Sequence, residues 1–92
     1  DNQTATHLYY IAREAVTNSI KHGKAGQIFI HLTDEEDGLA ITVRDNGEGA
    51  AELKNTGLGL RIMRYRAGVI GAEFSAGNRE EGGFEVRVQL KV

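Results

Sequence analysis

The run FEVRVQLKV, from Phe84 to Val92, limits the possible folds more than any other part of the sequence. Apolar side chains occupy every second position in it: Phe84, Val86, Val88, Leu90 and Val92. This alternation predicts a β-strand with one buried and one solvated face. The chain must therefore provide a sheet that is covered on one side and open to water on the other.

Two stretches have the spacing of amphipathic helices. Apolar positions recur at helical intervals over residues 8–20 and again over residues 58–70, which predicts two helices. Thr4 or Thr6 could cap the first helix, and Gly23 and Gly71 are the expected ends.

The remaining apolar runs predict further strands. Residues 26–33 and 38–45 are rich in β-forming residues and are joined by a polar turn at 34–37, so they read as a hairpin. A short strand is expected at 72–76, followed by a polar loop at 77–83. The order helix, strand, strand, helix, strand, strand predicts an α+β two-layer sandwich. Its sheet is mixed and mostly antiparallel, with both helices on one face.

Length and composition limit the classes of function. The 92 residues predict one domain, residues 1–92, with a single modest core. A net charge of −2 argues against nucleic acid and an anionic membrane surface as partners, and no apolar run is long enough to cross a bilayer. Cysteine is absent, which excludes disulfides and thiolate metal sites and suits a cytoplasmic protein. Because the chain begins with Asp1, we expect it to be part of a longer protein.

Three polar residues of the first predicted helix fall on one narrow arc beside the apolar stripe. Glu14, Asn18 and Lys21 are spaced i, i+4, i+7, and together offer the groups that hydrated Mg²⁺ carrying phosphates requires. The alternative is an ordinary solvated face with a hydrogen-bonded ladder. His22 is equally open, since it could cap the helix end or lie near phosphate.

A second candidate group follows the strand that ends at Asp45. A carboxylate at a strand end can accept a hydrogen bond from an exocyclic amine such as that of adenine. Gly47 and Gly49 would let the base approach the backbone. The alternative is a simple turn, because Asp-Asn-Gly is a common turn sequence.

A third group opens the second predicted helix. The run Gly57-Leu58-Gly59-Leu60 places glycines where free backbone N–H groups at a helix N-terminus can hold phosphate. The polar segment 50–56 before it is a candidate lid over a ligand or else a surface loop.

Taken in order, these three groups resemble the conserved boxes of the GHKL ATPase superfamily. Glu14 to His22 resembles the N box, Asp45 to Gly49 the G1 box and Gly57 to Leu60 the G2 box. Residues 8–14 and 61–67 are similar to the ATP-binding domains of bacterial sensor histidine kinases of the nitrate-sensor and DesK-like branch.

The resemblance implies a Bergerat-type fold that binds ATP with Mg²⁺ and presents the γ-phosphate to a histidine. Carried over by position, Asn18 would coordinate Mg²⁺, Glu14 would polarise the attacking group or a metal-bound water, and Lys21 and His22 would face phosphate oxygens. The other residues that it implicates are the base-binding Asp45, Gly47 and Gly49 and the phosphate-binding Gly57, Leu58, Gly59 and Leu60.

The sequence departs from the family pattern in three respects. Phe84 follows Gly82-Gly83 where many relatives have a threonine near the adenine site, which puts that contact in doubt, and Leu90-Lys91 replaces the usual closing Leu-Pro. No dimerisation helix with a phosphate-accepting histidine is present, and we expect His7 and His31 to be structural.

The implied function is that of the catalytic domain of a two-component sensor kinase. Its partners would be the dimerisation and histidine phosphotransfer domain of the same kinase and a response regulator, with the parent protein possibly anchored in a membrane. Two alternatives stay open: a catalytically inactive nucleotide-binding module, and an anti-sigma-type serine kinase of the same superfamily.

Overall fold

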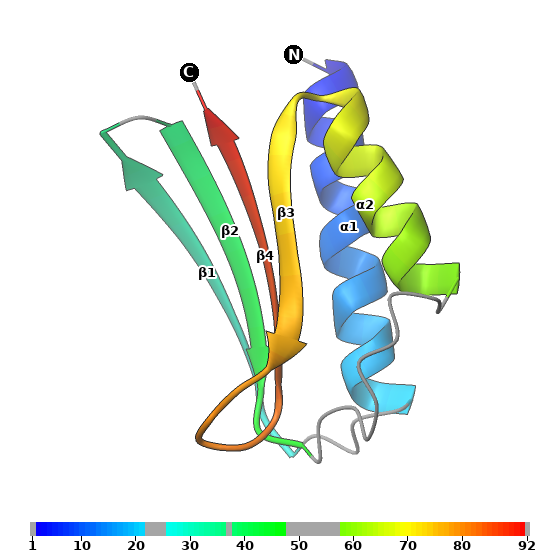
Figure 1. The fold of residues 1–92 in the computed structure, drawn as a ribbon, viewed down its shortest axis with the longest axis vertical. Helices are drawn as coiled ribbons and strands as arrows, with labels where there is room; N and C mark the ends of the chain where they lie inside the picture. Colours follow the sequence, from blue (N-terminus) through cyan, green and yellow to red (C-terminus); the bar gives the residue numbers. More distant parts are fainter. Residues whose placement is uncertain (1, 22–25, 37, 48–57, 92) are drawn as a thin grey trace.

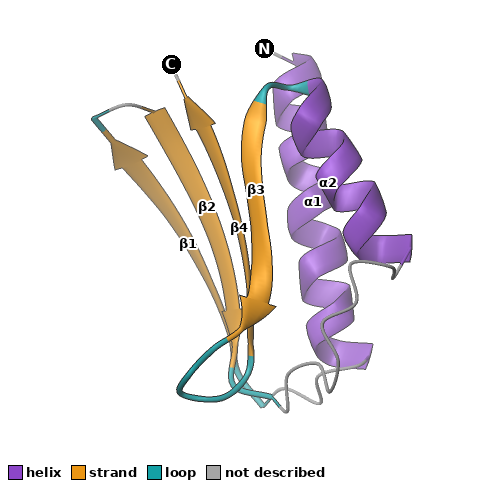
Figure 2. Cartoon of the chain, viewed as in Figure 1, coloured by secondary structure: helices purple, strands orange, loops and turns teal. Residues whose placement is uncertain are grey.

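The computed structural model describes residues 2–21, 26–36, 38–47 and 58–91, which form two helices on one face of a four-stranded sheet (Figures 1 and 2). The elements in chain order are α1 (Asn2–Lys21), β1 (Ile28–Glu35), β2 (Gly38–Asp45), α2 (Leu58–Val69), β3 (Ala72–Asn78) and β4 (Phe84–Lys91). Neighbouring strands pair antiparallel in the order β1-β2-β4-β3. The predicted two-layer α+β fold is confirmed, with the difference that the described strands are antiparallel throughout and the sheet is not mixed.

The core lies between the helices and the two central strands. Val43 of β2 is directly opposite Val86 of β4, and Ile41 is opposite Val88, so apolar side chains meet across the sheet on the face that carries the helices. The buried cluster comprises Ile11, Ala15, Val43, Met63, Ala67, Val86 and Val88. In each helix the two buried members are four residues apart, as expected for one apolar stripe. The alternating apolar residues of β4 thus form the buried face of the strand, as predicted.

Helix α1 begins earlier than its apolar pattern indicates. It starts at Asn2, and Thr4 and Thr6 lie inside it, so the predicted cap is wrong. The extra turns contact the end of α2 through His7, whose Nδ1 lies 3.2 Å from Arg66 Nη1, and the Arg66 guanidinium carbon also lies 4.5 Å from the centre of the ring of Tyr10, in the next turn. Polar and aromatic contacts between helices therefore extend α1 where the apolar stripe gives no signal.

Two strands also differ from the prediction. The hairpin of β1 and β2 is confirmed, but β1 runs to Glu35, two residues beyond the expected end. Strand β3 continues to Asn78, because Gly77 and Asn78 still pair with Glu85 and Phe84 of β4. The second helix ends just before Gly71, as predicted, whereas Gly23 lies outside the described residues.

Strand β1 forms the edge of the sheet that lies farthest from the helices (Figure 1). Its Ile30 and Leu32 are opposite Val43 and Ile41, yet both side chains are largely exposed. The reason is the placement of the second layer, since α1 packs on β2 and α2 packs on β3. Ile30 and Leu32 therefore lie beyond the cover that these two helices provide, whereas Ile28 at the start of β1 still packs against the core.

Met63 is the largest apolar side chain that is fully buried, with 0% exposure. Substitution Met63→Ala leaves a cavity between α2 and the sheet, so we expect the free energy of unfolding to fall by about 2–5 kcal/mol. Urea denaturation followed by circular dichroism measures this. Val69→Ala, in the same helix but 40% exposed, is the control and should cost less than about 1 kcal/mol. An equal loss in the free energy of unfolding for the two variants would show that Met63 is not part of the core.

Candidate functional site

The carboxylate of Asp45 is buried at the end of β2, with only 1% of the residue exposed. A charge removed from water is tolerated only when hydrogen bonds replace its hydration. Three donors do so here: the hydroxyl of Ser19 donates to Oδ2 (2.6 Å), and the backbone N–H groups of Gly47 (2.9 Å) and Phe84 (3.1 Å) donate to Oδ1. Helix α1, the segment after β2 and the start of β4 therefore meet at one side chain.

The two oxygens of the Asp45 carboxylate accept different numbers of hydrogen bonds. A carboxylate can accept about four hydrogen bonds, two at each oxygen. Within the described part of the chain Oδ1 accepts two and Oδ2 accepts one, from Ser19. Among the described residues, one of the two acceptor positions of Oδ2 is thus without a donor, and an amine bound by this carboxylate would take that position.

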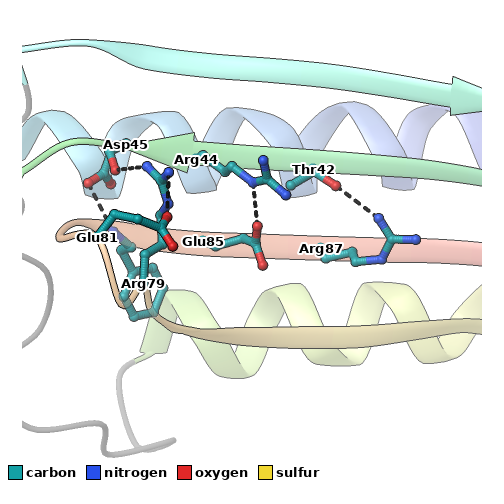
Figure 3. A network of polar contacts seen from close by, with 8 residues as sticks. Thr42, Arg44, Asp45, Arg79, Glu81, Glu85 and Arg87 are labelled. Atoms are coloured by element: carbon teal, nitrogen blue, oxygen red, sulfur yellow. Dashed lines mark hydrogen bonds and ion pairs between the residues drawn. The ribbon is translucent and has the colours of Figure 1, made fainter.

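The turn between β3 and β4 closes over the backbone of Asp45. A Cβ atom at Gly83 would overlap the carbonyl oxygen of Asp45 and lie 2.7 Å from its carbonyl carbon, and the φ angle of Gly83 is +91°. Only glycine meets both conditions. Arg79, at the other end of this turn, donates from Nη1 to the same carbonyl oxygen at 2.9 Å (Figure 3).

The side chain of Asn46 hydrogen-bonds the segment after β2 to the two residues that precede β1. Its side-chain oxygen accepts hydrogen bonds from the backbone N–H groups of Gly26 (3.0 Å) and Gln27 (2.8 Å), and its amide donates to Gln27 Oε1 (3.3 Å). The half-buried Gly47 follows directly. The sequence Asp-Asn-Gly is therefore more than a turn, because its first two side chains both bind other parts of the chain.

A second group of candidate residues lies where α1 and α2 touch. A Cβ atom at Gly59 would overlap Glu14 Oε1 and lie 3.2 Å from Asn18 Nδ2, so the start of α2 rests on these two side chains. Lys21 is exposed at the last position of α1, and the half-buried Leu60 packs against the core. Glu14, Asn18 and Gly59 are thus brought together as the sequence predicted.

Helix α1 connects the two groups through adjacent residues. Asn18 faces the start of α2, and Ser19, about 100° further round the helix, faces Asp45. The end of β2 and the start of α2 therefore lie against two sides of one helix. His22, Gly49, Gly57 and segment 50–56 fall outside the described residues, and only the backbone of Leu58 is described, as the first residue of α2.

Sequence reasoning missed Ser19, Arg79 and Gly83 as parts of this site. Ser19 counted only as a member of the apolar arc of α1, whereas its hydroxyl makes the shortest hydrogen bond to Asp45. A hydroxyl within an apolar stripe was the available signal, because such a group must find a partner when buried.

Loss of the Ser19 hydroxyl leaves Oδ2 of a buried carboxylate without its donor. We expect Ser19→Ala to lower the free energy of unfolding by about 1–3 kcal/mol. Chemical denaturation measures the change, with Ser75→Ala on the exposed face of β3 as the control for the same substitution. If both variants match the unsubstituted protein, the bond contributes nothing to stability.

Comparisons with known proteins agree with this geometry. Residues 3–92 match the family described as histidine kinase-, DNA gyrase B- and HSP90-like ATPases. The nitrate/nitrite sensor protein NarX of Escherichia coli K12 is 37% identical over 86 residues, covering 91% of this chain and 14% of that protein. The sensor protein VraS of Staphylococcus epidermidis is 33% identical over 85 residues, covering 90% of this chain and 24% of that protein.

A solved structure shows the same fold. The ATP-binding domain of PrrB from Mycobacterium tuberculosis superposes with a TM-score of 0.81 at 26% identity, over 94% of this chain and 67% of that one. The chain spans no more than a quarter of the two curated relatives, from 14% to 24% of their lengths. The chain belongs to the family of histidine kinase-, DNA gyrase B- and HSP90-like ATPases, and within it corresponds to the ATP-binding catalytic domain of sensor histidine kinases.

Proposed function

We propose that this chain binds ATP together with Mg²⁺ and delivers the γ-phosphate to a histidine on a separate dimerisation domain of a two-component sensor kinase. The observation that carries the proposal is the buried Asp45 carboxylate, which accepts hydrogen bonds from three donors of the described residues and has one acceptor position at Oδ2 that none of them fills. An amine that reaches this position gains a charge-assisted hydrogen bond to a pre-oriented acceptor.

The base end of the site would select adenine. Adenine has an exocyclic amine that can donate to Asp45, whereas guanine has a carbonyl oxygen at the corresponding position, which a carboxylate repels. Gly47, whose N–H already binds Oδ1, has no side chain to obstruct the plane of the base. Gly49 would extend this open surface.

The phosphate end would lie at the start of α2. The first N–H groups of a helix have no partner within the helix, and the helix dipole favours negative charge there. Gly57 and Gly59, with Leu58 and Leu60 between and after them, would bring this backbone close to the phosphates. Lys21 and His22 would add positive charge from the end of α1.

Glu14 and Asn18 fit the requirements of Mg²⁺. Both carry oxygen ligands of the kind that this hard cation prefers, and both contact the start of α2, where the phosphates are proposed to bind. The described residues contain no cluster of three or more histidine, cysteine or acidic side chains, and Mg²⁺ typically takes most of its ligands from water and substrate phosphates. We propose Asn18 as the direct protein ligand, with Mg²⁺ neutralising phosphate charge when bound.

Phosphoryl transfer depends mainly on positioning and charge neutralisation, so the domain needs no nucleophile of its own. Glu14 would polarise the attacking group. We do not propose either described histidine as the acceptor: His7 contacts Arg66 on the helix layer, and His31 lies on β1, opposite Thr42. The acceptor would be on the dimerisation domain, and a response regulator would receive the phosphate.

The proposed reaction indicates on which side of a cell membrane this domain would lie. Because ATP is the substrate, we place this domain on the cytoplasmic side of a parent protein that carries it, whether or not that parent is anchored in a membrane. Among the described residues no helix has the length and apolarity needed to cross a bilayer.

The role of Asp45 in binding the base can be tested with ligands that share phosphates but differ in the base. Asp45→Asn should weaken ATP binding about ten- to a hundredfold, because the acceptor loses its charge, and leave inorganic tripolyphosphate within about twofold. Isothermal titration calorimetry measures both. Asp34→Asn, on the exposed part of β1, is the matched control. Parallel losses for the two ligands would show that Asp45 does not contact the base.

The role of Asn18 can be tested through the metal. Asn18→Asp adds a negative charge beside the proposed phosphate position, so we expect ATP binding to persist but to require a different Mg²⁺ concentration for half-saturation. ATP titrations over a series of Mg²⁺ concentrations measure this shift. Asn2→Asp, exposed at the first turn of α1, makes the same change far from the site. An identical Mg²⁺ profile in Asn18→Asp and the unsubstituted protein would exclude Asn18 as a ligand.

A further inference from the structure

We propose that Arg79 is a positioning residue of the base-binding end of the site, acting through the backbone of Asp45. The inference rests on the proposed role of Asp45 in binding adenine and adds a residue that neither the sequence motifs nor the family resemblance implicates. Its consequence is that discrimination between adenine and other bases depends on the turn between β3 and β4.

The contact is direct and partly sheltered. Arg79 Nη1 donates to the carbonyl oxygen of Asp45 at 2.9 Å, and only 21% of the Arg79 side chain is exposed (Figure 3). The other guanidinium nitrogen, Nη2, lies 2.9 Å from Glu81 Oε2. Glu81 is 71% exposed, so this ion pair adds little stability by itself, but it fixes the plane of the guanidinium.

The backbone of the turn joins Arg79 to the other residues that hold Asp45. The Arg79 N–H donates to the carbonyl of Gly83 (2.9 Å), and the Gly82 N–H donates to the carbonyl of Arg79 (3.1 Å). Gly83 lies against the Asp45 carbonyl, and Phe84 donates its N–H to Asp45 Oδ1. This turn and the residue that follows it therefore hydrogen-bond both the backbone carbonyl and the carboxylate of Asp45.

Asp45 needs this additional restraint because it lies where the central pairing ends. The last aligned pair between β2 and β4 is Arg44 with Glu85, and Asp45 has an aligned partner only on β1, at Ile28. Rotation of the peptide after Asp45 would turn the chain that follows it and move the Gly47 N–H, which donates to Oδ1 of the carboxylate. A charged donor on the carbonyl opposes that rotation, and hydrogen bonds with one ionised partner are about twice as strong as neutral ones.

Two arginines of the sheet provide a comparison for Arg79 of the turn. Arg44 pairs with Glu85, and Arg87 Nη1 lies 3.2 Å from the hydroxyl of Thr42; both contacts are further from the strand end than the bond of Arg79 (Figure 3). Arg87 is, like Arg79, a partly buried arginine with a neutral oxygen acceptor on β2. Replacing it makes a comparable change in charge and packing without touching Asp45.

The test compares three ligands in the unsubstituted protein and in Arg79→Ala, Arg87→Ala and Asp45→Asn. ATP, GTP and inorganic tripolyphosphate are titrated by calorimetry, and urea denaturation reports stability. For Arg79→Ala we expect the Kd of ATP to rise about tenfold while GTP and tripolyphosphate stay within about twofold, so the preference for ATP over GTP falls by about tenfold. Arg87→Ala should retain the preference of the unsubstituted protein.

Two results would overturn the inference: an unchanged preference for ATP over GTP in folded Arg79→Ala, or equal losses for all three ligands. These outcomes differ from failure of the proposed function, which would appear as no preference for ATP in the unsubstituted protein or a full preference in Asp45→Asn. If Arg79→Ala does not fold, Arg79→Lys replaces it. A reduced preference in Arg79→Lys that is absent from Arg87→Lys supports the role of Arg79, and an unreduced preference contradicts it.

Discussion

The buried carboxylate of Asp45 is the interaction on which the arrangement of this domain depends. A charge with 1% exposure requires donors, and the chain brings them from α1, from the segment after β2 and from the start of β4. These donors converge because the C-terminal end of α1 lies at the end of β2 and because the β3–β4 turn folds back over the same point (Figure 1). The hydrophobic core holds the two layers together, and the hydrogen bonds to this carboxylate connect α1 and the start of β4 to the end of β2.

Helix α1 forms the wall shared by both halves of the candidate nucleotide site. Neighbouring residues of this helix face different partners, Asn18 toward the start of α2 and Ser19 toward Asp45. Two glycines make the close approaches possible: Gly59 lets α2 rest on α1, and Gly83 lets the β3–β4 turn rest on β2. Glycine at these points serves the packing between elements, and the proposed base and phosphate ends are therefore linked through one helix.

The sequence predicted the fold well where periodicity is strong and less well where tertiary contacts decide. Apolar spacing indicated both helices, all four strands and the single covered face, and the resemblance indicated which residues meet around α1. The start of α1 was missed because Arg66 contacts stabilise its first turns, and the exposure of Ile30 and Leu32 was missed because their pattern equals that of a core strand. Local pattern cannot show which long-range partner a Ser19 or an Arg79 will find.

We propose that the buried Asp45 carboxylate accepts the amine of adenine at the Oδ2 position that no described donor fills. A crystal structure of the protein with Mg²⁺ and a non-hydrolysable ATP analogue tests this most directly. We expect the exocyclic amine within hydrogen-bonding distance of Asp45 Oδ2, with the bonds from Ser19, Gly47 and Phe84 retained. A base bound elsewhere, with Asp45 surrounded only by protein donors, would contradict it.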